Sequence, residues 1–193
     1  MSMETFRTAI YAAMDYGSYI TIGGGEPTLH PDILAMIGMA AMVSEEAVFM
    51  VTNGTCSEKV WRSLMGARDK EILHVGVSND LWHDTSMLQP WVIRDANKYK
   101  LWWGDPSLGQ RTLVKRGRAV RNWSKLLQDC RLSGIEVEEI ETECGDPRID
   151  PNGLVWPDVP NYGSTGSIYD SDSLRCAYDI IREYEGRQLG DRP

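Results

Sequence analysis

The sequence has no long apolar run. None of its 193 residues belongs to a stretch that approaches the roughly 20 apolar residues of a membrane-spanning helix. Its first residues, Met1-Ser2-Met3-Glu4, also lack the basic flank and apolar core of a secretory signal. Neither a membrane protein nor a secreted protein is expected, and we predict a cytoplasmic location.

Positive charge is also scarce. The chain has 20 Lys and Arg residues against 28 Asp and Glu residues, which gives a formal net charge of -8. General nucleic-acid binders need clustered basic side chains to neutralise phosphates. Nucleic-acid binding is therefore not expected, and the acidic balance mainly indicates solubility.

Closely spaced cysteines are missing too. The four cysteines are Cys56, Cys130, Cys144 and Cys176, and no two of them form a CxxC pair. Such spacing gives none of the tight ligand clusters that bind zinc or iron. No metal-ligating residue is predicted, and free or buried thiols in a reducing compartment are the simplest interpretation.

Strand-like and helix-like segments alternate in the first part of the chain. The apolar spacing over residues 3–13 is typical of an amphipathic helix, and the apolar run at 48–51 of a strand with both faces covered. Strands that alternate with helices predict an α/β protein with a mainly parallel sheet. Further strands are predicted at 19–22 and 73–77, and further helices at 31–42 and 55–64, the latter opened by a Thr55–Glu58 capping box.

The pattern weakens later in the chain. Strands are predicted at 113–115 and 135–140, with a helix between them that ends at Leu132. From Cys144 the composition changes to Gly, Pro, Asp and Asn, which predicts turns and a hairpin before a terminal helix that stops near Gly186. We therefore predict two domains, 1–143 and 144–193.

A glycine-rich turn, Gly23-Gly24-Gly25-Glu26-Pro27, follows the first predicted strand. Taken alone, three glycines show only that the backbone turns tightly or approaches something closely. In parallel α/β sheets, however, ligands bind beyond the carboxyl ends of strands. A carboxylate beside exposed backbone carbonyls at such an end suits a positively charged amine.

Four segments in order resemble the signature regions of radical-SAM enzymes. Ile20–Asp32 resembles the Gly-Gly-Glu-Pro segment, and Val51–Thr55 resembles the Thr-Asn-Gly exit of the next strand. Val75–Asp80 resembles the polar end of the strand after it, with His83 and Asp84 beyond, and Gly117–Ala119 resembles a fifth-strand motif. The resemblance implies a partial (β/α) TIM-like barrel that lacks the family's first strand.

The same resemblance implies S-adenosylmethionine as cofactor, with its amino group held by the glycine turn. The residues that it singles out for cofactor binding are Gly24, Gly25, Glu26, Asn53, Ser78, Asp80 and Arg118. Simpler interpretations stay open for three of them. Asn53 and Asp80 are ordinary turn residues, and Arg118 could pair with a surface acid.

The sequence departs from the family at the chemistry-bearing loop. Radical-SAM enzymes hold a [4Fe–4S] cluster with three thiolates from a CxxxCxxC loop, and this sequence contains no such loop. Cys144–Val155 is similar to the hairpin of SPASM-type extensions, but Trp156 stands near the place of the cysteine that usually follows. We therefore expect that this chain alone does not bind the cluster, and we assign no catalytic residue.

Two functions remain open. The chain could be a radical-SAM enzyme without its cluster loop, acting on an unknown small molecule or peptide. It could instead be a naturally shortened pseudoenzyme, including one encoded by a mobile element, that acts as a protein-binding or inhibitory module. Without the family's first strand, the next strand would have an unpaired edge. We therefore also expect that the chain forms a homodimer or binds a protein partner at that edge, or covers the edge with its own termini.

Overall fold

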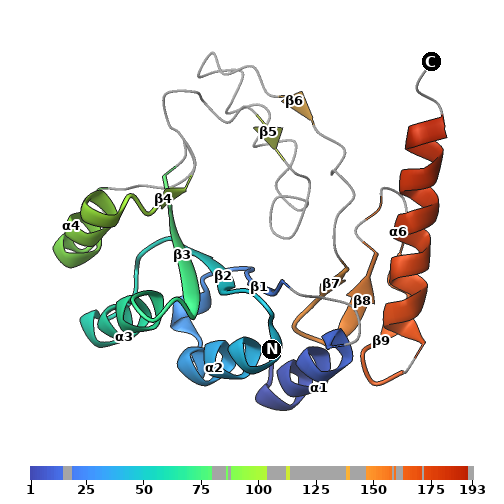
Figure 1. The fold of residues 1–193 in the computed structure, drawn as a ribbon, viewed down its shortest axis with the longest axis horizontal. Coiled ribbons are helices and arrows are strands. Elements are labelled where there is room, and N and C mark those ends of the chain that lie inside the picture. The colour runs from blue at the N-terminus through green and yellow to red at the C-terminus, as the bar shows by residue number, and fades with distance from the viewer. Residues whose placement is uncertain are drawn as a thin grey trace. The chain divides into compact units, whose positions relative to one another are not determined.

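Strands and helices alternate along the first part of the chain (Figure 1). The computed structural model describes residues 1–14, 19–79, 86, 88–103, 112–113, 138–139, 147–157, 159, 163–170 and 172–190. The chain divides into two compact units, Met1–Gly109 and Gln110–Pro193. The first unit contains α1 (Met3–Ala13), β1 (Thr21–Ile22), the 3-10 helix η1 (Pro27–Leu29), α2 (Ile33–Val43), β2 (Val48–Thr52), α3 (Glu58–Arg68), β3 (Leu73–Ser78), α4 (Pro90–Tyr99) and β4 (Trp102–Trp103).

One parallel sheet organises this unit, with the strand order β1-β2-β3-β4. Its longest pairing joins Val48–Thr52 to Leu73–Val77 in register. Parallel neighbours cannot be joined by tight turns, and the helices between the strands supply the crossovers. The predicted α/β class with a parallel sheet is confirmed. The described strands form an open sheet with β1 at one edge, and they do not close a barrel.

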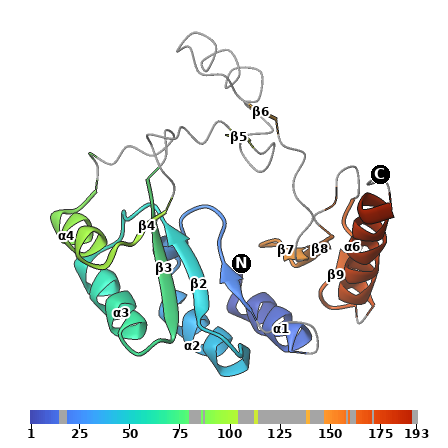
Figure 2. The same cartoon turned by 45° about the horizontal axis from the view of Figure 1, so that its top comes forward.

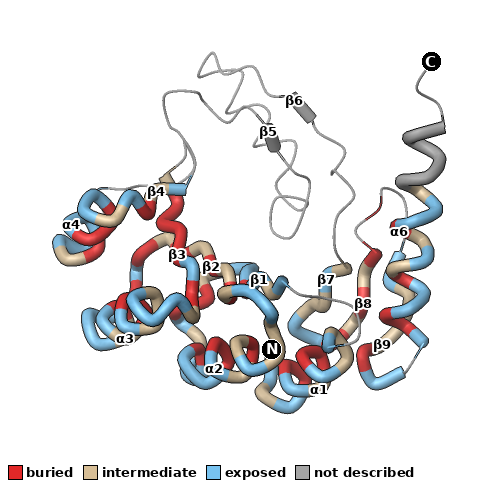
Figure 3. Tube along the Cα trace, in the orientation of Figure 1, coloured by how far each residue is buried: buried red, intermediate tan, exposed pale blue. Residues whose placement is uncertain are grey.

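The core lies between this sheet and its helices (Figures 2 and 3). On β2, Val48, Met50 and Thr52 are almost fully buried, whereas Phe49 and Val51 on the other face are only half-buried. The prediction that both faces of β2 are covered is therefore wrong for the described residues. His74 on β3, which pairs with Phe49, is exposed.

The helices begin slightly later than the sequence predicts. Helix α3 is capped by Ser57, whose hydroxyl accepts a hydrogen bond from the Val60 N–H at 3.3 Å. The predicted Thr55–Glu58 capping box is wrong, because Thr55 donates its N–H and its hydroxyl to Asn53 instead. Helix α2 starts at Ile33 rather than at Pro31, since η1 and a turn intervene.

The described residues of the second unit form two small sheets and one long helix. Its elements are β5 (Thr112–Leu113), β6 (Glu138–Glu139), β7 (Arg148–Ile149), β8 (Leu154–Trp156), β9 (Gly166–Ser167) and α6 (Ser173–Gly190). β5 and β6 pair in parallel, and β7, β8 and β9 form an antiparallel sheet. The predicted hairpin is therefore confirmed, and the terminal helix continues to Gly190 rather than ending near Gly186.

Other predictions fall outside the described residues. These are the domain boundary after residue 143, the helix that would end at Leu132, and most of the two strands predicted at 113–115 and 135–140, of which only 113, 138 and 139 are described. In the part of the chain that the structure describes, no helix is both long enough and apolar enough to cross a membrane.

Candidate functional site

The glycine turn lies at the carboxyl end of β1 and is open to its surroundings. Gly23, Gly24 and Gly25 are exposed, and a Cβ atom added to any of them would meet nothing within 4 Å. Gly24 and Gly25 have φ angles of 85° and 55°, which L residues with side chains rarely adopt. The turn therefore presents bare backbone that an outside group can approach.

Glu26 follows the turn, and its carboxylate is occupied by the protein itself. One oxygen, Oε1, accepts hydrogen bonds from the Thr28 N–H at 3.0 Å, from the Thr28 hydroxyl, and from the Thr52 hydroxyl at 2.5 Å. The other oxygen, Oε2, accepts from the Asn53 N–H at 2.7 Å. The side chain thus joins the end of β1 to the end of β2. Because both carboxylate oxygens already accept hydrogen bonds, a ligand amine at this turn would contact the glycine backbone rather than a free carboxylate.

Asn53 forms the corresponding turn after β2. Its Oδ1 accepts hydrogen bonds from the Thr55 N–H at 3.0 Å and from the Thr55 hydroxyl at 2.6 Å. The N–H of Gly54 donates to the Thr52 hydroxyl at 3.0 Å, and Gly54 has a φ of 73°. The side-chain oxygen of Asn53 therefore stabilises its own turn, which agrees with the interpretation of Asn53 as an ordinary turn residue.

Ser78 ends β3 at the same edge of the parallel sheet, and its side chain is buried. It lies opposite Trp103 of β4, and the next residue, Asn79, donates its N–H to the Trp103 carbonyl at 2.8 Å. The remaining predicted site residues, Asp80 and Arg118, lie outside the described residues, as do His83 and Asp84. The structure thus connects the glycine turn to Asn53 through Glu26 and places Ser78 two strands away.

Two threonines of this site were not predicted. Thr28 and Thr52 are 5% and 1% exposed, and both hydroxyls donate to the Glu26 carboxylate. Without the carboxylate these buried hydroxyls would lose their acceptor, which is costly away from water. The Thr-Asn-Gly segment includes Thr52 and so indicated that this residue lies near the site. Nothing in the sequence shows that two threonines converge on one glutamate.

Cys56 lies close to Glu26 and Thr28 of the site. Its side chain is buried, and burial raises the pKa of the thiol above its ordinary value. The negative charge of Glu26 adds to this increase, while hydrogen bonds from its own backbone and with Thr28 partly offset it. A thiol held in its protonated form is a poor iron ligand, because clusters bind thiolates.

The described residues do not fit an iron–sulfur cluster. They include no group of three His, Cys, Asp or Glu side chains placed to hold a metal ion. Cys176 is exposed on α6 of the second unit, and Cys130 and Cys144 lie outside the described residues. The exposed glycine backbone, in contrast, is compatible with the amino group of S-adenosylmethionine.

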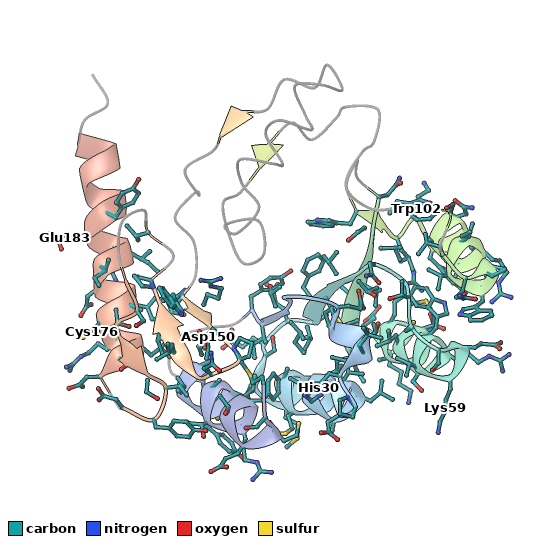
Figure 4. All side chains as sticks on the ribbon, turned by 180° about the vertical axis from the view of Figure 1, so that it is seen from behind. His30, Lys59, Trp102, Asp150, Cys176 and Glu183 are labelled. Carbon is teal, nitrogen blue, oxygen red and sulfur yellow. The ribbon has the colours of Figure 1, made fainter. Side chains whose placement is uncertain are left out.

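An aromatic cluster covers part of the other sheet face. The Phe49 ring lies 4.8 Å from the Trp103 ring and 6.4 Å from the Tyr19 ring, centroid to centroid. Trp103 is 54% exposed, so it is largely accessible to solvent and not a core residue. Its neighbour Trp102 is half-buried and donates from Nε1 to Asn97 at 2.8 Å (Figure 4).

Comparisons of this chain with models of protein families, with curated proteins and with solved structures found no match.

Proposed function

We propose that this chain binds S-adenosylmethionine on a partial barrel of the radical-SAM type, with the methionine amino group at the Gly24–Gly25 turn. The carrying observation is the exposed left-handed backbone of that turn at the carboxyl end of a parallel strand. An ammonium group is a hydrogen-bond donor and needs acceptors, which the backbone carbonyls of Gly23–Gly25 can supply. Glu26 supports this arrangement as an anchor, because its hydrogen bonds from Thr52 and Asn53 hold the turn against the end of β2.

In this proposal the chain does not carry out radical chemistry alone. When bound to a [4Fe–4S] cluster, S-adenosylmethionine is the family's radical source, but the 193 residues contain no CxxxCxxC. Burial raises the pKa of the Cys56 thiol, and the described residues include no group of three His, Cys, Asp or Glu side chains that could hold a metal ion. We accordingly expect iron and sulfide contents near zero after anaerobic reconstitution of this polypeptide.

A binding test separates the turn from the rest of the chain. Isothermal titration with S-adenosylmethionine should give a measurable heat for the parent chain and an affinity about ten-fold lower for Gly24→Ala, since the strained turn must rearrange. Gly66→Ala is the matched control, because Gly66 is exposed on α3, has no neighbour near its added Cβ, and should leave the affinity unchanged. No heat with folded parent protein, or equal affinity of Gly24→Ala and parent, would overturn the proposal.

A protein-binding pseudoenzyme is the second candidate. It is favoured by β1, a two-residue strand that stands at the sheet edge among the described strands and exposes Thr21. An unpaired edge can accept a strand from another copy or from a partner. Light scattering of the same preparation tests the homodimer: a strictly monomeric chain over a wide concentration range would contradict it.

A further inference from the structure

Helix α2 has an unusual composition for a helix that is partly exposed. All eleven of its residues, from Ile33 to Val43, are apolar or glycine. Helices that are apolar all round are normally buried all round, because any exposed face would leave apolar area in contact with water. The composition of α2 therefore predicts that other parts of a protein cover it on more than one side.

Only one side of α2 is buried by the described residues. Ile33, Met36, Ile37 and Ala40 face the core and are at most 6% exposed. On the opposite side, Leu34 is 42% exposed and Met42 is 85% exposed. The tube in Figure 3 shows this alternation of buried and exposed segments along α2.

Three of the exposed residues of α2 form one continuous ridge. Leu34, Gly38 and Met42 follow each other at intervals of four, so they stand one above the other on the helix surface. A Cβ atom added to Gly38 would meet nothing within 4 Å, so the middle of the ridge is low and open. Ridges of residues four apart are the ones along which helices commonly pack against each other, at about 8–10 Å between axes.

The charges at the ends of α2 indicate what kind of partner fits. Asp32 stands directly before the helix, and Glu45 and Glu46 follow shortly after it; all three are exposed. In a two-fold pairing of α2 with a second copy, the Asp32 end of one helix would approach the Glu45–Glu46 end of the other. Like charges would then face each other at both ends, which disfavours a second copy.

We infer that the outer face of α2, defined by Leu34, Gly38 and Met42, binds an amphipathic helix of another protein that carries Lys or Arg at both ends of its apolar stripe. The apolar stripe would cover the ridge, with a small or apolar side chain over Gly38. Its basic ends would meet Asp32 on one side and the Glu45–Glu46 pair on the other. The inference does not depend on S-adenosylmethionine, because the α2 face contains none of the proposed cofactor contacts.

The test uses the full chain and two synthetic helical peptides of equal length and equal apolar stripe. One peptide carries two lysines at each end and the other carries two glutamates at each end. Fluorescence anisotropy at low salt should show binding of the lysine peptide, and the affinity for the glutamate peptide should be lower by about ten-fold or more. Raising the salt concentration should narrow this difference, since exposed charge pairs are screened.

Chain variants show whether the peptide uses this face. Met42→Gln and Gly38→Gln should each lower the affinity for the lysine peptide by about five-fold or more. Met42→Gln removes apolar contact, and Gly38→Gln places a side chain at the low point of the ridge. Gly38→Gln also replaces a poor helix former with a good one, so lost binding cannot be attributed to a lost helix. Ile93→Gln is the matched control, because Ile93 is 37% exposed on α4, which α3 separates from α2 in Figures 1 and 2.

The results divide cleanly. Preference for the lysine peptide, lost in Met42→Gln and Gly38→Gln but kept in Ile93→Gln, supports the inference. Equal affinity for both peptides, binding that survives both α2 variants, or no binding of either peptide overturns it. Self-association of the chain that Met42→Gln abolishes would also overturn it, since the face would then be covered by a second copy.

Discussion

Two glycine turns stand at the ends of neighbouring strands, and their surroundings differ. At Gly54, after β2, an added Cβ would lie 2.4 Å from Leu88 Cδ2 and 3.0 Å from Val92 Cγ1. At Gly24, after β1, an added Cβ would meet nothing within 4 Å. Both have positive φ angles. The protein's own packing therefore explains the glycine at 54, but only the backbone conformation explains the glycine at 24.

This difference separates a structural turn from a candidate binding turn. Where internal side chains fill the space beside a glycine, no outside group is needed to account for it. Where that space is open, the bare backbone is accessible to a ligand. Glu26 connects the two, because its Oε2 accepts the Asn53 N–H at 2.7 Å and so fixes the open turn to the packed one.

Substituting each glycine by alanine tests the comparison most strongly. Gly54→Ala should lower the free energy of unfolding by about 3 kcal/mol, since a strained φ adds to a clash with Leu88 and Val92. Gly24→Ala carries only the backbone strain and should cost about 1 kcal/mol. Urea unfolding followed by circular dichroism measures both. Equal losses at the two positions would show that the packed and the open turn do not differ.

Removing the connection between the turns should have the next largest effect. Glu26→Ala leaves the Thr52 hydroxyl and the Asn53 N–H without their acceptor, and we expect a loss of about 2 kcal/mol in unfolding free energy. Glu26→Gln keeps one acceptor oxygen, and the threonine hydroxyls can rotate to accept from its amide, so about 1 kcal/mol is expected.

The same urea titrations decide whether Glu26 is an anchor. If Glu26→Ala unfolds at the same urea concentration as the parent chain, the four hydrogen bonds contribute nothing measurable. Thr28→Val is a useful second variant, because it removes one of the two hydroxyl donors and keeps the shape of the side chain. Its loss should be smaller than that of Glu26→Ala, since the other donors keep their acceptor.

Much of the sheet could be predicted from the sequence. The strands near Ile22, Met50 and Val75 are apolar runs bounded by turn residues, and such patterns depend mainly on local sequence. The glycine turn and the Asn53 turn were also predictable, because both need conformations that few residues adopt. Strand β4 was not predictable, because two residues, Trp102 and Trp103, are too few to show the alternation of apolar and polar residues that indicates a strand.

Contacts between distant residues account for what the sequence did not reveal. The indole of Trp61 donates to Asp95 at 2.9 Å across 34 residues, and no local pattern indicates that pair. The convergence of Thr28 and Thr52 on Glu26 is of the same kind. The exposure of His74 is not evident from its neighbours Leu73 and Val75, which are buried; it projects from the strand face that the described helices leave uncovered.

Thiol labelling tests how tightly the packed turn is closed. Cys56 follows Gly54 by two residues; it is 4% exposed, and burial raises its pKa, so it should react with iodoacetamide at pH 8 at least about ten-fold more slowly than the exposed Cys176. Peptide mapping by mass spectrometry measures each site. Glu26→Gln removes a negative charge that raises this pKa, so it should increase the labelling rate of Cys56 only slightly. Gly54→Ala should increase that rate more, because it loosens the packing around the turn. Equal labelling of Cys56 and Cys176 in the folded parent chain would mean that the end of β2 is as open as the end of β1.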